Sequence, residues 1–167
     1  MYYVPYDCPL GTLLLTCTDQ GLTGILMNQE LPEGRKDHPI LLKTVSWLDA
    51  YFRGEAFLPE IPLAPEGTDF QKQVWKILER IPFGVTMTYG DIAREMAVLR
   101  GKEKMSAQAV GQAVGRNPIN ILVPCHRCLG AGGQLTGYSC GLEKKIWLLN
   151  HEGHKIEKDI VVETRRD

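Results

Sequence analysis

The chain has 167 residues, of which 44% are hydrophobic and 23% charged, and its formal net charge is −1. This composition is that of a globular protein, and the length supports one domain or two small ones without disulfide or metal cross-links. No run of about 20 apolar residues predicts a transmembrane helix, and the start lacks the basic and apolar segments of a secretory signal, so we expect a cytoplasmic protein without membrane association.

Charge is distributed unevenly along the chain. Residues 1–69 carry a net charge of −6, whereas residues 70–167 carry +5. A basic half favours a polyanionic partner, although ordinary variation in surface charge gives the same division.

The first part of the chain predicts a small antiparallel sheet. Two apolar runs, residues 13–18 and 22–27, flank Asp19–Gly21, whose Asp and Gly suit a hairpin turn. A cluster of turn residues at 5–11 precedes them, and we expect a second turn there.

A helix follows, and after it a change in composition. Pro39 suits the first turn of a helix that runs to about Arg53, and Gly54 ends it. The apolar positions that share one helical face are Leu41, Val45, Leu48 and Phe52. Residues 58–68 contain three prolines and no apolar periodicity, which indicates an extended linker between two domains or a long surface loop.

The second half predicts helices with identifiable caps. Thr68 or Asp69 caps a helix that ends near Ile81. Thr88–Asp91 has the spacing of a capping box and begins a second helix. Ser106 caps a third helix, built from Ala and Gly residues, that runs to about residue 114.

The second and third of these helices suggest a helix-turn-helix, because small side chains let a helix lie close to a nucleic acid backbone; plain helix packing explains them as well. A last amphipathic helix with Leu142, Ile146 and Leu149 on one face ends at Gly153. The predicted fold is an α/β domain over residues 1–69, then a mostly α domain over 70–167.

One of the five cysteines lies in a reactive context. Cys125 directly follows an apolar run and Pro124, and precedes His126 and Arg127. Adjacent positive charge favours the thiolate, which is the nucleophilic form, and a neighbouring His suits a general base. We therefore expect a nucleophilic thiol at Cys125, with a buried inert thiol as the alternative.

Two further alternatives involve the other cysteines. Cys125 and Cys128 form a C-x-x-C, which is typical of redox sites, but no strand-crossover-strand pattern surrounds them. Zinc ligation by Cys125, Cys128 and Cys140 with a nearby histidine lacks a second C-x-x-C or H-x₃-H spacing. We expect neither a metal nor a cofactor.

Pro124–Arg127, preceded by Asn117–Pro118 and followed by Gly137–Ser139, resembles the signature of methylated-DNA–protein-cysteine methyltransferases, the O6-alkylguanine-DNA alkyltransferases. The similarity covers roughly residues 70–155 and includes 81–84, 88–90, 109–111 and 147–153. It implies an RNase H-like first domain, a second domain with a helix-turn-helix, and a monomer that acts on double-stranded DNA containing O6-alkylguanine.

The resemblance also implies a reaction. The alkyl group of O6-methylguanine, or of O4-methylthymine, passes once and irreversibly from a flipped-out base to Cys125. His126 takes the thiol proton through a bridging water, Glu152 orients His126, and Asn117 ties the helix-turn-helix to the cysteine segment. Arg127 is expected to be structural and to bond across the two domains.

Further positions follow from the same resemblance. Tyr89 contacts the guanine ring and Ser139 contacts O6. The remaining predicted substrate-binding residues are Val123, Cys128 and Cys140. The predicted DNA-binding residues are Gln108, Ala109, Gly111, Thr88 and Arg116. Charge alone adds Lys102, Lys104 and Lys144 as candidate phosphate contacts.

The sequence departs from the family pattern at three positions. Gln108 stands where many relatives have an arginine that fills the place of the extruded base. Cys140 replaces a usual Gly, and Asn120 replaces a Pro found in some relatives, so we expect bulky alkyl groups to fit poorly. The alternative function is a DNA-binding protein that senses alkylation without transfer; such relatives lack the reactive cysteine, which Cys125 provides here.

Overall fold

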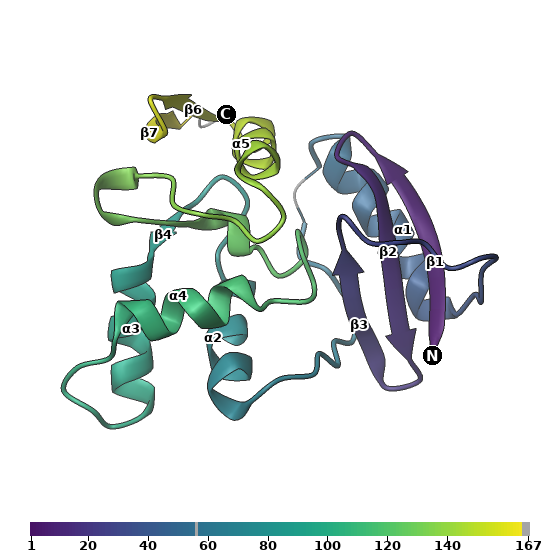
Figure 1. The fold of residues 1–167 in the computed structure, drawn as a ribbon, viewed down its shortest axis with the longest axis horizontal. Helices are drawn as coiled ribbons and strands as arrows, with labels where there is room; N and C mark the ends of the chain where they lie inside the picture. Colours follow the sequence, from purple (N-terminus) through teal and green to yellow (C-terminus); the bar gives the residue numbers. More distant parts are fainter. Residues whose placement is uncertain (56, 165–167) are drawn as a thin grey trace. The chain divides into compact units, whose positions relative to one another are not determined.

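The computed structural model describes residues 1–55 and 57–164, which fold as two compact units (Figure 1). The first unit comprises residues 1–66 and 118–122, and the second comprises 67–117 and 123–167. The sequence predicts a division at residue 69 and assigns all later residues to the second domain. That boundary stays a prediction; in the structure, residues 118–122 belong to the first compact unit, because this segment hydrogen-bonds to a strand there.

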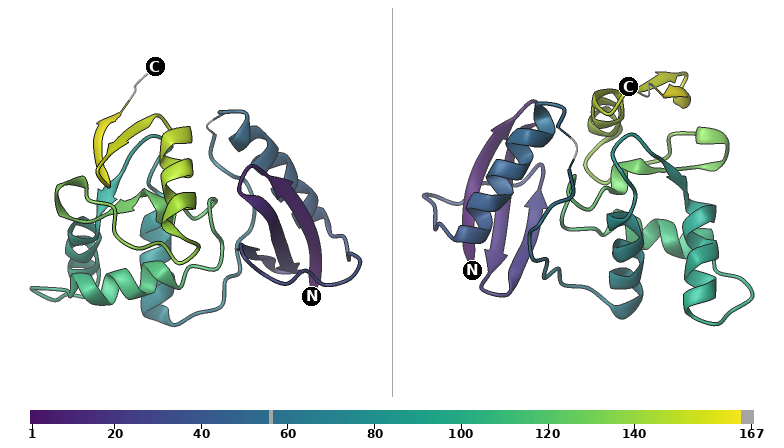
Figure 2. Two further views of the ribbon diagram at one scale, coloured as in Figure 1. Left: turned by 45° about the horizontal axis from the view of Figure 1, so that its top comes forward. Right: turned by 180° about the vertical axis from the view of Figure 1, so that it is seen from behind.

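The first unit is a three-stranded antiparallel sheet with one helix on a face. Its strands are β1 (Tyr2–Cys8), β2 (Gly11–Thr18) and β3 (Gly21–Leu26), in the order β1-β2-β3. Helix α1 (Pro39–Phe52) contacts all three strands (Figures 1 and 2). The predicted hairpin and helix are therefore both confirmed.

The turn predicted at residues 5–11 is wrong for most of its length. Strand β1 runs through Pro5, which pairs with Leu14 of β2, and only Pro9 and Leu10 turn. Proline is tolerated there because β1 is the outer strand of the sheet, where a missing N–H breaks no second ladder.

Two distant segments hydrogen-bond to β3. The amide of Leu22 donates to the Pro62 carbonyl, and the amide of Ala64 donates to the Leu22 carbonyl, both at 2.8 Å. Part of the predicted linker is thus a β-bridge, not a free connection. On the same strand, the amide of Ile25 donates to Pro118 (3.0 Å) and the Ile25 carbonyl accepts from Nδ2 of Asn120 (2.9 Å). Asn120 is therefore a buried structural residue of the first unit.

Up to residue 164, the second unit contains four α-helices and two small sheets. Its helices are α2 (Asp69–Glu79), α3 (Tyr89–Leu99), α4 (Ala107–Gly115) and α5 (Leu142–His151). Its strands are β4 (Met87–Thr88), β5 (Cys128–Leu129), β6 (His154–Glu157) and β7 (Ile160–Thr164). The hairpin β6–β7 is an element that the sequence analysis did not predict.

The predicted caps begin the helices as expected. Thr68 and Thr88 each form a reciprocal capping box, with Gln71 and Asp91 respectively, and Ser106 accepts from the Ala109 amide. Each cap satisfies backbone donors that the first helical turn leaves unpaired.

Helix α4 packs against both α2 and α3. Its Val110, Ala113 and Val114 are buried, and the indole of Trp75 donates to the Ala113 carbonyl at 2.8 Å. The small residues of α4 thus serve packing on one face. No helix among residues 1–55 and 57–164 is long and apolar enough to cross a membrane.

Candidate active site

Cys125 lies in a tight, buried turn of the second unit. It begins a single 3₁₀ turn, Cys125–Arg127, and its amide donates to the Val123 carbonyl at 2.8 Å. Pro124 between them has φ −82° and ψ 67°, which is the conformation of an inverse γ-turn. Fixed φ at proline therefore helps to hold the cysteine in place. The Cys125 side chain is only 3% exposed.

The environment keeps the Cys125 thiol protonated at rest. Burial raises its pKa to about 11, and hydrogen bonds from the side chains of Asn117 and Tyr138 and the charge of Lys145 lower it only in part. The expectation that His126 and Arg127 favour the thiolate is wrong, because both side chains turn toward Glu152. The proton must therefore leave the thiol during the reaction.

His126, Glu152 and Arg127 form one buried network. Nε2 of His126 lies 2.6 Å from Oε2 of Glu152. Arg127 donates from Nε to Oε1 of Glu152 (2.7 Å) and from Nη2 to Oε2 (3.1 Å), which is a bidentate ion pair. The amide of Gly84 also donates to Oε1, at 3.4 Å. All three side chains of the network are less than 10% exposed.

The network fixes the protonation of its members. Burial of the Glu152 carboxyl opposes ionisation, but the hydrogen bonds from His126 and Arg127 and the charge of Arg127 outweigh it and hold the pKa of Glu152 well below its ordinary value. Burial lowers the pKa of His126, so its ring is neutral at pH 7. A neutral ring beside a carboxylate carries its proton on Nε2, which leaves Nδ1 as the basic nitrogen. Nδ1 is buried and has no hydrogen-bond partner among the described residues.

Arg127 acts within the second unit. Besides Glu152, its guanidinium donates to the Ile81 carbonyl at 2.5 Å and lies over the Phe83 ring at 5.9 Å. The prediction of a bond across the two domains is corrected, since these partners all belong to the second unit. Arg127 is structural, as expected, because it neutralises Glu152 and anchors the loop before β4.

Asn117 connects the end of α4 with the cysteine turn. Its Nδ2 donates to the Val123 carbonyl at 2.8 Å, and its side chain also hydrogen-bonds the Cys125 thiol. The buried Asn117 side chain therefore joins two segments, as the resemblance implies.

Lys145 is a site residue that the sequence analysis missed. Its side chain is completely buried, and its ammonium donates to the Cys128 carbonyl at 2.7 Å and to the Thr136 carbonyl at 3.4 Å. It also lies 6.0 Å from the centre of the Tyr89 ring. Burial lowers the pKa of Lys145. A signal was available, because Lys145 lies two turns before Glu152 on the same helical face, three residues after Leu142.

A cleft of about 780 Å³ opens beside these groups, and its wall comes from three places. The start of α3 and the first half of α4 form two sides, and a glycine-rich loop after β5 forms the third. The lining residues are Thr88, Tyr89, Gly90, Arg94, Ala107, Gln108, Gly111, Gln112, Gly130, Ala131, Thr136 and Gly137. The structure therefore brings four predicted residues, Thr88, Tyr89, Gln108 and Gly111, to one cleft.

Tyr89 links the cleft to the buried thiols. Burial raises its pKa, the Thr136 side chain hydrogen-bonds it, and Cys128 and Cys125 are near enough to add to the rise. The Tyr89 hydroxyl therefore stays protonated at neutral pH and can donate a hydrogen bond. Tyr89 lies near Cys128 because β4 pairs in parallel with β5, which aligns Met87 with Cys128 and Thr88 with Leu129.

The other predicted binding residues do not line the cleft within the described part of the chain. Val123 and Cys128 are buried and contribute backbone carbonyls to the bonds of Asn117 and Lys145. Ser139 Oγ lies 3.9 Å from Cys140 Sγ, and the nearby Cys140 raises the pKa of Cys125. Ala109 and Arg116 lie on α4, Ala109 in its first turn and Arg116 at its C-terminal cap.

The zinc alternative finds no support in the arrangement of side chains. No group of three or more His, Cys, Asp and Glu residues among residues 1–55 and 57–164 is placed to hold a metal ion. The five cysteines, all in this range, form no disulfide.

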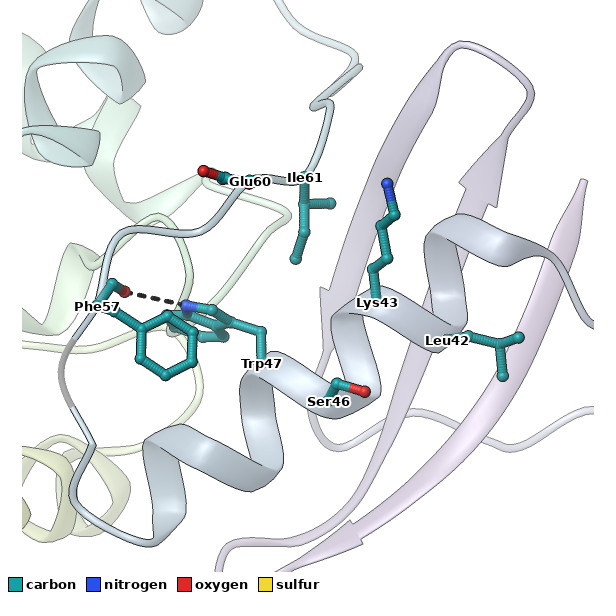
Figure 3. A pocket seen from close by; sticks show the side chains of 7 residues that line it. All are labelled: Leu42, Lys43, Ser46, Trp47, Phe57, Glu60 and Ile61. Atoms are coloured by element: carbon teal, nitrogen blue, oxygen red, sulfur yellow. Dashed lines mark hydrogen bonds between the residues drawn. The ribbon is translucent and has the colours of Figure 1, made fainter.

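The first unit has a hollow of its own, with a volume of about 420 Å³, between α1 and the segment at residues 57–61 (Figure 3). Trp47 forms its centre and donates from Nε1 to the Phe57 carbonyl at 3.3 Å. Lys43 and Glu60 are its charged members, Ser46 contributes a hydroxyl, and no Cys or His lines it among the described residues. The chemistry therefore gathers in the second unit.

Comparisons with known proteins match the two parts of the chain to two different family models. The family model for the 6-O-methylguanine DNA methyltransferase DNA binding domain matches residues 69–154, and that for its ribonuclease-like domain matches residues 1–65. The methylated-DNA–protein-cysteine methyltransferase of Methanosarcina acetivorans is 44% identical over 159 residues, covering 92% of this chain and 99% of the relative. The protein of the same name from Mycobacterium leprae is 41% identical over 155 residues, covering 90% and 91%.

A solved structure agrees as well. The crystal structure of Mycobacterium tuberculosis OGT in complex with DNA has a TM-score of 0.77 at 41% identity, and the match covers 90% of this chain and 91% of that chain. The predicted fold, a ribonuclease-like α/β domain before a helical domain, is thereby confirmed. The chain belongs to the methylated-DNA–protein-cysteine methyltransferase family.

Proposed function

We propose that this protein repairs DNA by moving the alkyl group of O6-methylguanine, and of O4-methylthymine, onto Cys125. The observation that carries the assignment to this residue is the His126–Glu152 pair, whose nitrogen and oxygen lie 2.6 Å apart. That contact leaves Nδ1 as the basic nitrogen of His126, the residue that follows the buried Cys125, and a nucleophile with an oriented base is what alkyl transfer requires.

The proton and electron pairs move in a balanced way. Nδ1 of His126 accepts the thiol proton, through a bridging water, as the sulfur of Cys125 attacks the methyl carbon. The new S–C bond forms while the C–O6 bond breaks, and its electron pair stays on guanine, which then takes up a proton. The Tyr89 hydroxyl, kept protonated by the burial that raises its pKa, supports this step by donating to the departing base.

The thioether has no group that reverses its formation, so each molecule reacts once. Hydrogen bonds from Asn117 and Tyr138 and the charge of Lys145 stabilise the thiolate as it develops. Pre-alignment of the nucleophile in a rigid turn supplies much of the remaining acceleration.

The burial of Cys125 supports base flipping. A side chain 3% exposed cannot reach an atom inside a stacked duplex, so the alkylated base must rotate out and enter the cleft. Tyr89, at the start of α3, would contact the ring of that base, and Ser139 would contact O6.

Helices α3 and α4 act in this proposal as a helix-turn-helix. The exposed Gln108 on α4 would fill the space left by the extruded base. A Cβ added at Gly111 would lie 3.8 Å from the Tyr89 ring, which is an ordinary contact, so the packing of the chain itself does not require glycine there. Close approach of a DNA backbone gives a reason for it. Arg116, Lys102 and Lys104 are exposed and suit phosphate contacts.

The protein would act as a monomer, because one chain holds the nucleophile, the base and the cleft. Its cytoplasmic location, inferred from the sequence, stays a prediction. The domain boundary at residue 69 likewise stays a sequence prediction beside the units described above.

The test mixes the protein with a duplex that contains one O6-methylguanine and measures intact mass, followed by peptide mapping. We expect one added methyl group per chain, located on Cys125, and none in Cys125→Ser. Cys128→Ser is the matched control, because it removes a second buried thiol and should still accept the methyl group. Lesion binding without a mass change would identify a non-enzymatic sensor and overturn the proposal.

A further inference from the structure

The hairpin β6–β7 contacts the loop that forms one wall of the cleft. The Leu135 amide donates to the Asp159 carbonyl at 2.7 Å, and Gln134 pairs with Ile160 as an antiparallel bridge. Figure 2 displays this hairpin beside the loop that follows β5. Leu135 also belongs to a buried cluster with Leu129 and Leu149, onto which Ile156 and Val161 of the hairpin pack. The loop is therefore attached to the hairpin by backbone bonds and by apolar contacts.

The loop in turn contacts the residue at the head of α3. Thr136 directly follows Leu135, lines the cleft, and hydrogen-bonds the Tyr89 side chain. Its carbonyl accepts from the buried ammonium of Lys145. Leu135, which is bonded to the hairpin, is thus the immediate neighbour of the residue that hydrogen-bonds Tyr89.

The hairpin has its own closing contact. Nδ1 of the buried His154 and the Thr164 hydroxyl lie 2.8 Å apart, at the open end of the hairpin. At the other end, Lys158 and Asp159 both have positive φ, 50° and 59°, as in the tight turns that suit hairpins. The hairpin is therefore a defined element, and most of it lies beyond residue 154, where the match to the family model ends.

We propose that hairpin β6–β7 is a positioning element of the binding site. It holds the loop at residues 130–137 against α3, keeps Thr136 on Tyr89, and so sets the shape of the cleft for the extruded alkylated nucleotide. This inference rests on the proposed function, which it extends from the reacting residues to an element that touches neither substrate nor thiol. Its effect falls on recognition of the base and leaves the thiol chemistry unchanged.

Two adjacent glycines offer a matched pair of variants. Gly133 has φ +81°, and a Cβ there would lie 3.2 Å from the Val161 carbonyl oxygen, so Gly133→Ala pushes the hairpin away from the loop. Gly132 has φ +71° and nothing within 4 Å of an added Cβ. Gly132→Ala therefore carries the same backbone strain without the hairpin contact.

The experiment measures single-turnover methyl transfer from the O6-methylguanine duplex as a function of DNA concentration. Relative to Gly132→Ala, we expect Gly133→Ala to raise the DNA concentration that gives half of the limiting rate by about tenfold, because a small misplacement of a contact has effects of this order. The limiting rate and the reaction of Cys125 with iodoacetamide should change less than about twofold. Equal behaviour of the two variants, or a loss confined to the limiting rate, would overturn the inference.

A second readout does not depend on transfer. In NMR spectra, the Leu135 amide should exchange faster and the Tyr89 ring signals should shift in Gly133→Ala, but not in Gly132→Ala. Faster exchange with unchanged Tyr89 signals would disprove the link to Tyr89. If Gly133→Ala does not fold, Thr164→Val, which removes the bond to His154, should give smaller changes in the same direction, and its failure to do so would overturn the inference. Absence of methyl transfer in the wild-type protein would reject the proposed function alone, because the NMR comparison still decides the role of the hairpin.

Discussion

The two compact units differ sharply in what they bury. Among the described residues, the buried polar side chains of the first unit are Thr16, Thr44 and Asn120, which are all neutral. Among the described residues, the second unit buries five charged or imidazole side chains in addition to Asn117; they are His126, Arg127, Lys145, Glu152 and His154. Burying such groups is unfavourable unless each is paired. Their concentration in the second unit therefore lowers the stability of that unit, and it is explained by their role in the reaction at Cys125.

The energetic consequence is that the second unit depends on specific pairs. Glu152 is stabilised by Arg127 and His126, and Lys145 by two backbone carbonyls. By contrast, the ion pair between Arg53 and Glu55 in the first unit is exposed. Exposed pairs contribute little, because water solvates the separated charges nearly as well.

The sharpest way to break this contrast is Glu152→Gln. The change leaves the buried guanidinium of Arg127 without a counter-charge, which should lower the free energy of unfolding by about 3–5 kcal/mol. Urea denaturation measures this loss. Glu55→Gln in the first unit is the control and should leave the midpoint unchanged. A small effect of Glu152→Gln would show that the network is not what holds the second unit together.

Lys145→Met should have the next largest effect. It removes the donor to the Cys128 and Thr136 carbonyls, and unsatisfied buried acceptors are destabilising by about 1–3 kcal/mol. The lost positive charge should also raise the pKa of Cys125 further, because Lys145 now lowers it.

The pH dependence of iodoacetamide reaction at Cys125 measures the second consequence. We expect the profile of Lys145→Met to move to higher pH, with the exposed Lys72→Met as the control. An unshifted profile in a folded Lys145→Met protein would exclude an electrostatic role for this ammonium.

Acid should weaken the second unit selectively, through both buried histidines. Burial lowers the pKa values of His126 and His154 from 6.5, so below that pH the unfolded chain binds protons that the folded chain does not. Stability contributed by the neutral rings is present above pH 6.5 and falls as the pH drops below it. Glu152, whose pKa is depressed, adds a further loss below pH 4.5. Hydrogen exchange read separately in peptides of each unit should reveal earlier opening of the second; equal opening would contradict this.

A substitution in the cleft, Gly111→Ala, should have a smaller effect than the changes above, and it should act on DNA binding. Gly111→Ala should weaken affinity for duplex DNA by about tenfold if a backbone must approach α4 there, while helix propensity slightly favours Ala. Gly115→Ala, on the same helix with nothing within 4 Å of an added Cβ, is the matched control. Fluorescence anisotropy with a labelled duplex decides between them, and equal affinities would remove α4 from the DNA-binding face.

Gln108→Arg should produce the smallest change, and in the favourable direction. A guanidinium stacks on bases and carries charge, which a Gln amide does not, and such contacts at exposed sites are worth about 0.5–1 kcal/mol. We expect methyl transfer from duplex substrate to accelerate by about two- to fivefold. A rate that is unchanged or lower would argue that Gln108 does not occupy the place of the extruded base.

The parts of the fold that the sequence predicted are those fixed by local chemistry. The helix starts were predictable at Thr88, Asp91 and Ser106, because these side chains hydrogen-bond to nearby backbone N–H groups. The hairpin β6–β7 was missed because Lys158–Asp159 forms its turn in place of an Asn-Gly or Asp-Gly pair. Strand β1 was missed because Pro5 signals a turn unless one knows that the strand is at an edge.

The candidate site divides in the same way. The cysteine, histidine and glutamate were found from a motif, and the structure joins His126 to Glu152 as expected. The direction in which the Cys125 pKa shifts was not predictable. Its sequence neighbours His126 and Arg127 face Glu152, and burial of the thiol is the dominant effect on its pKa. Lys145 was missed because a lysine on an amphipathic helix is ordinarily exposed, and its two carbonyl partners come from distant segments.

The central claim is that burial keeps His126 neutral and that Glu152 fixes its proton on Nε2, which leaves Nδ1 ready to accept the Cys125 proton. Nitrogen-15 NMR of the histidine rings in the wild-type protein at pH 7 tests it most directly. We predict one protonated and one unprotonated nitrogen for His126, with the proton on Nε2, and loss of that preference in Glu152→Gln. A doubly protonated ring, or a proton on Nδ1, would contradict the account.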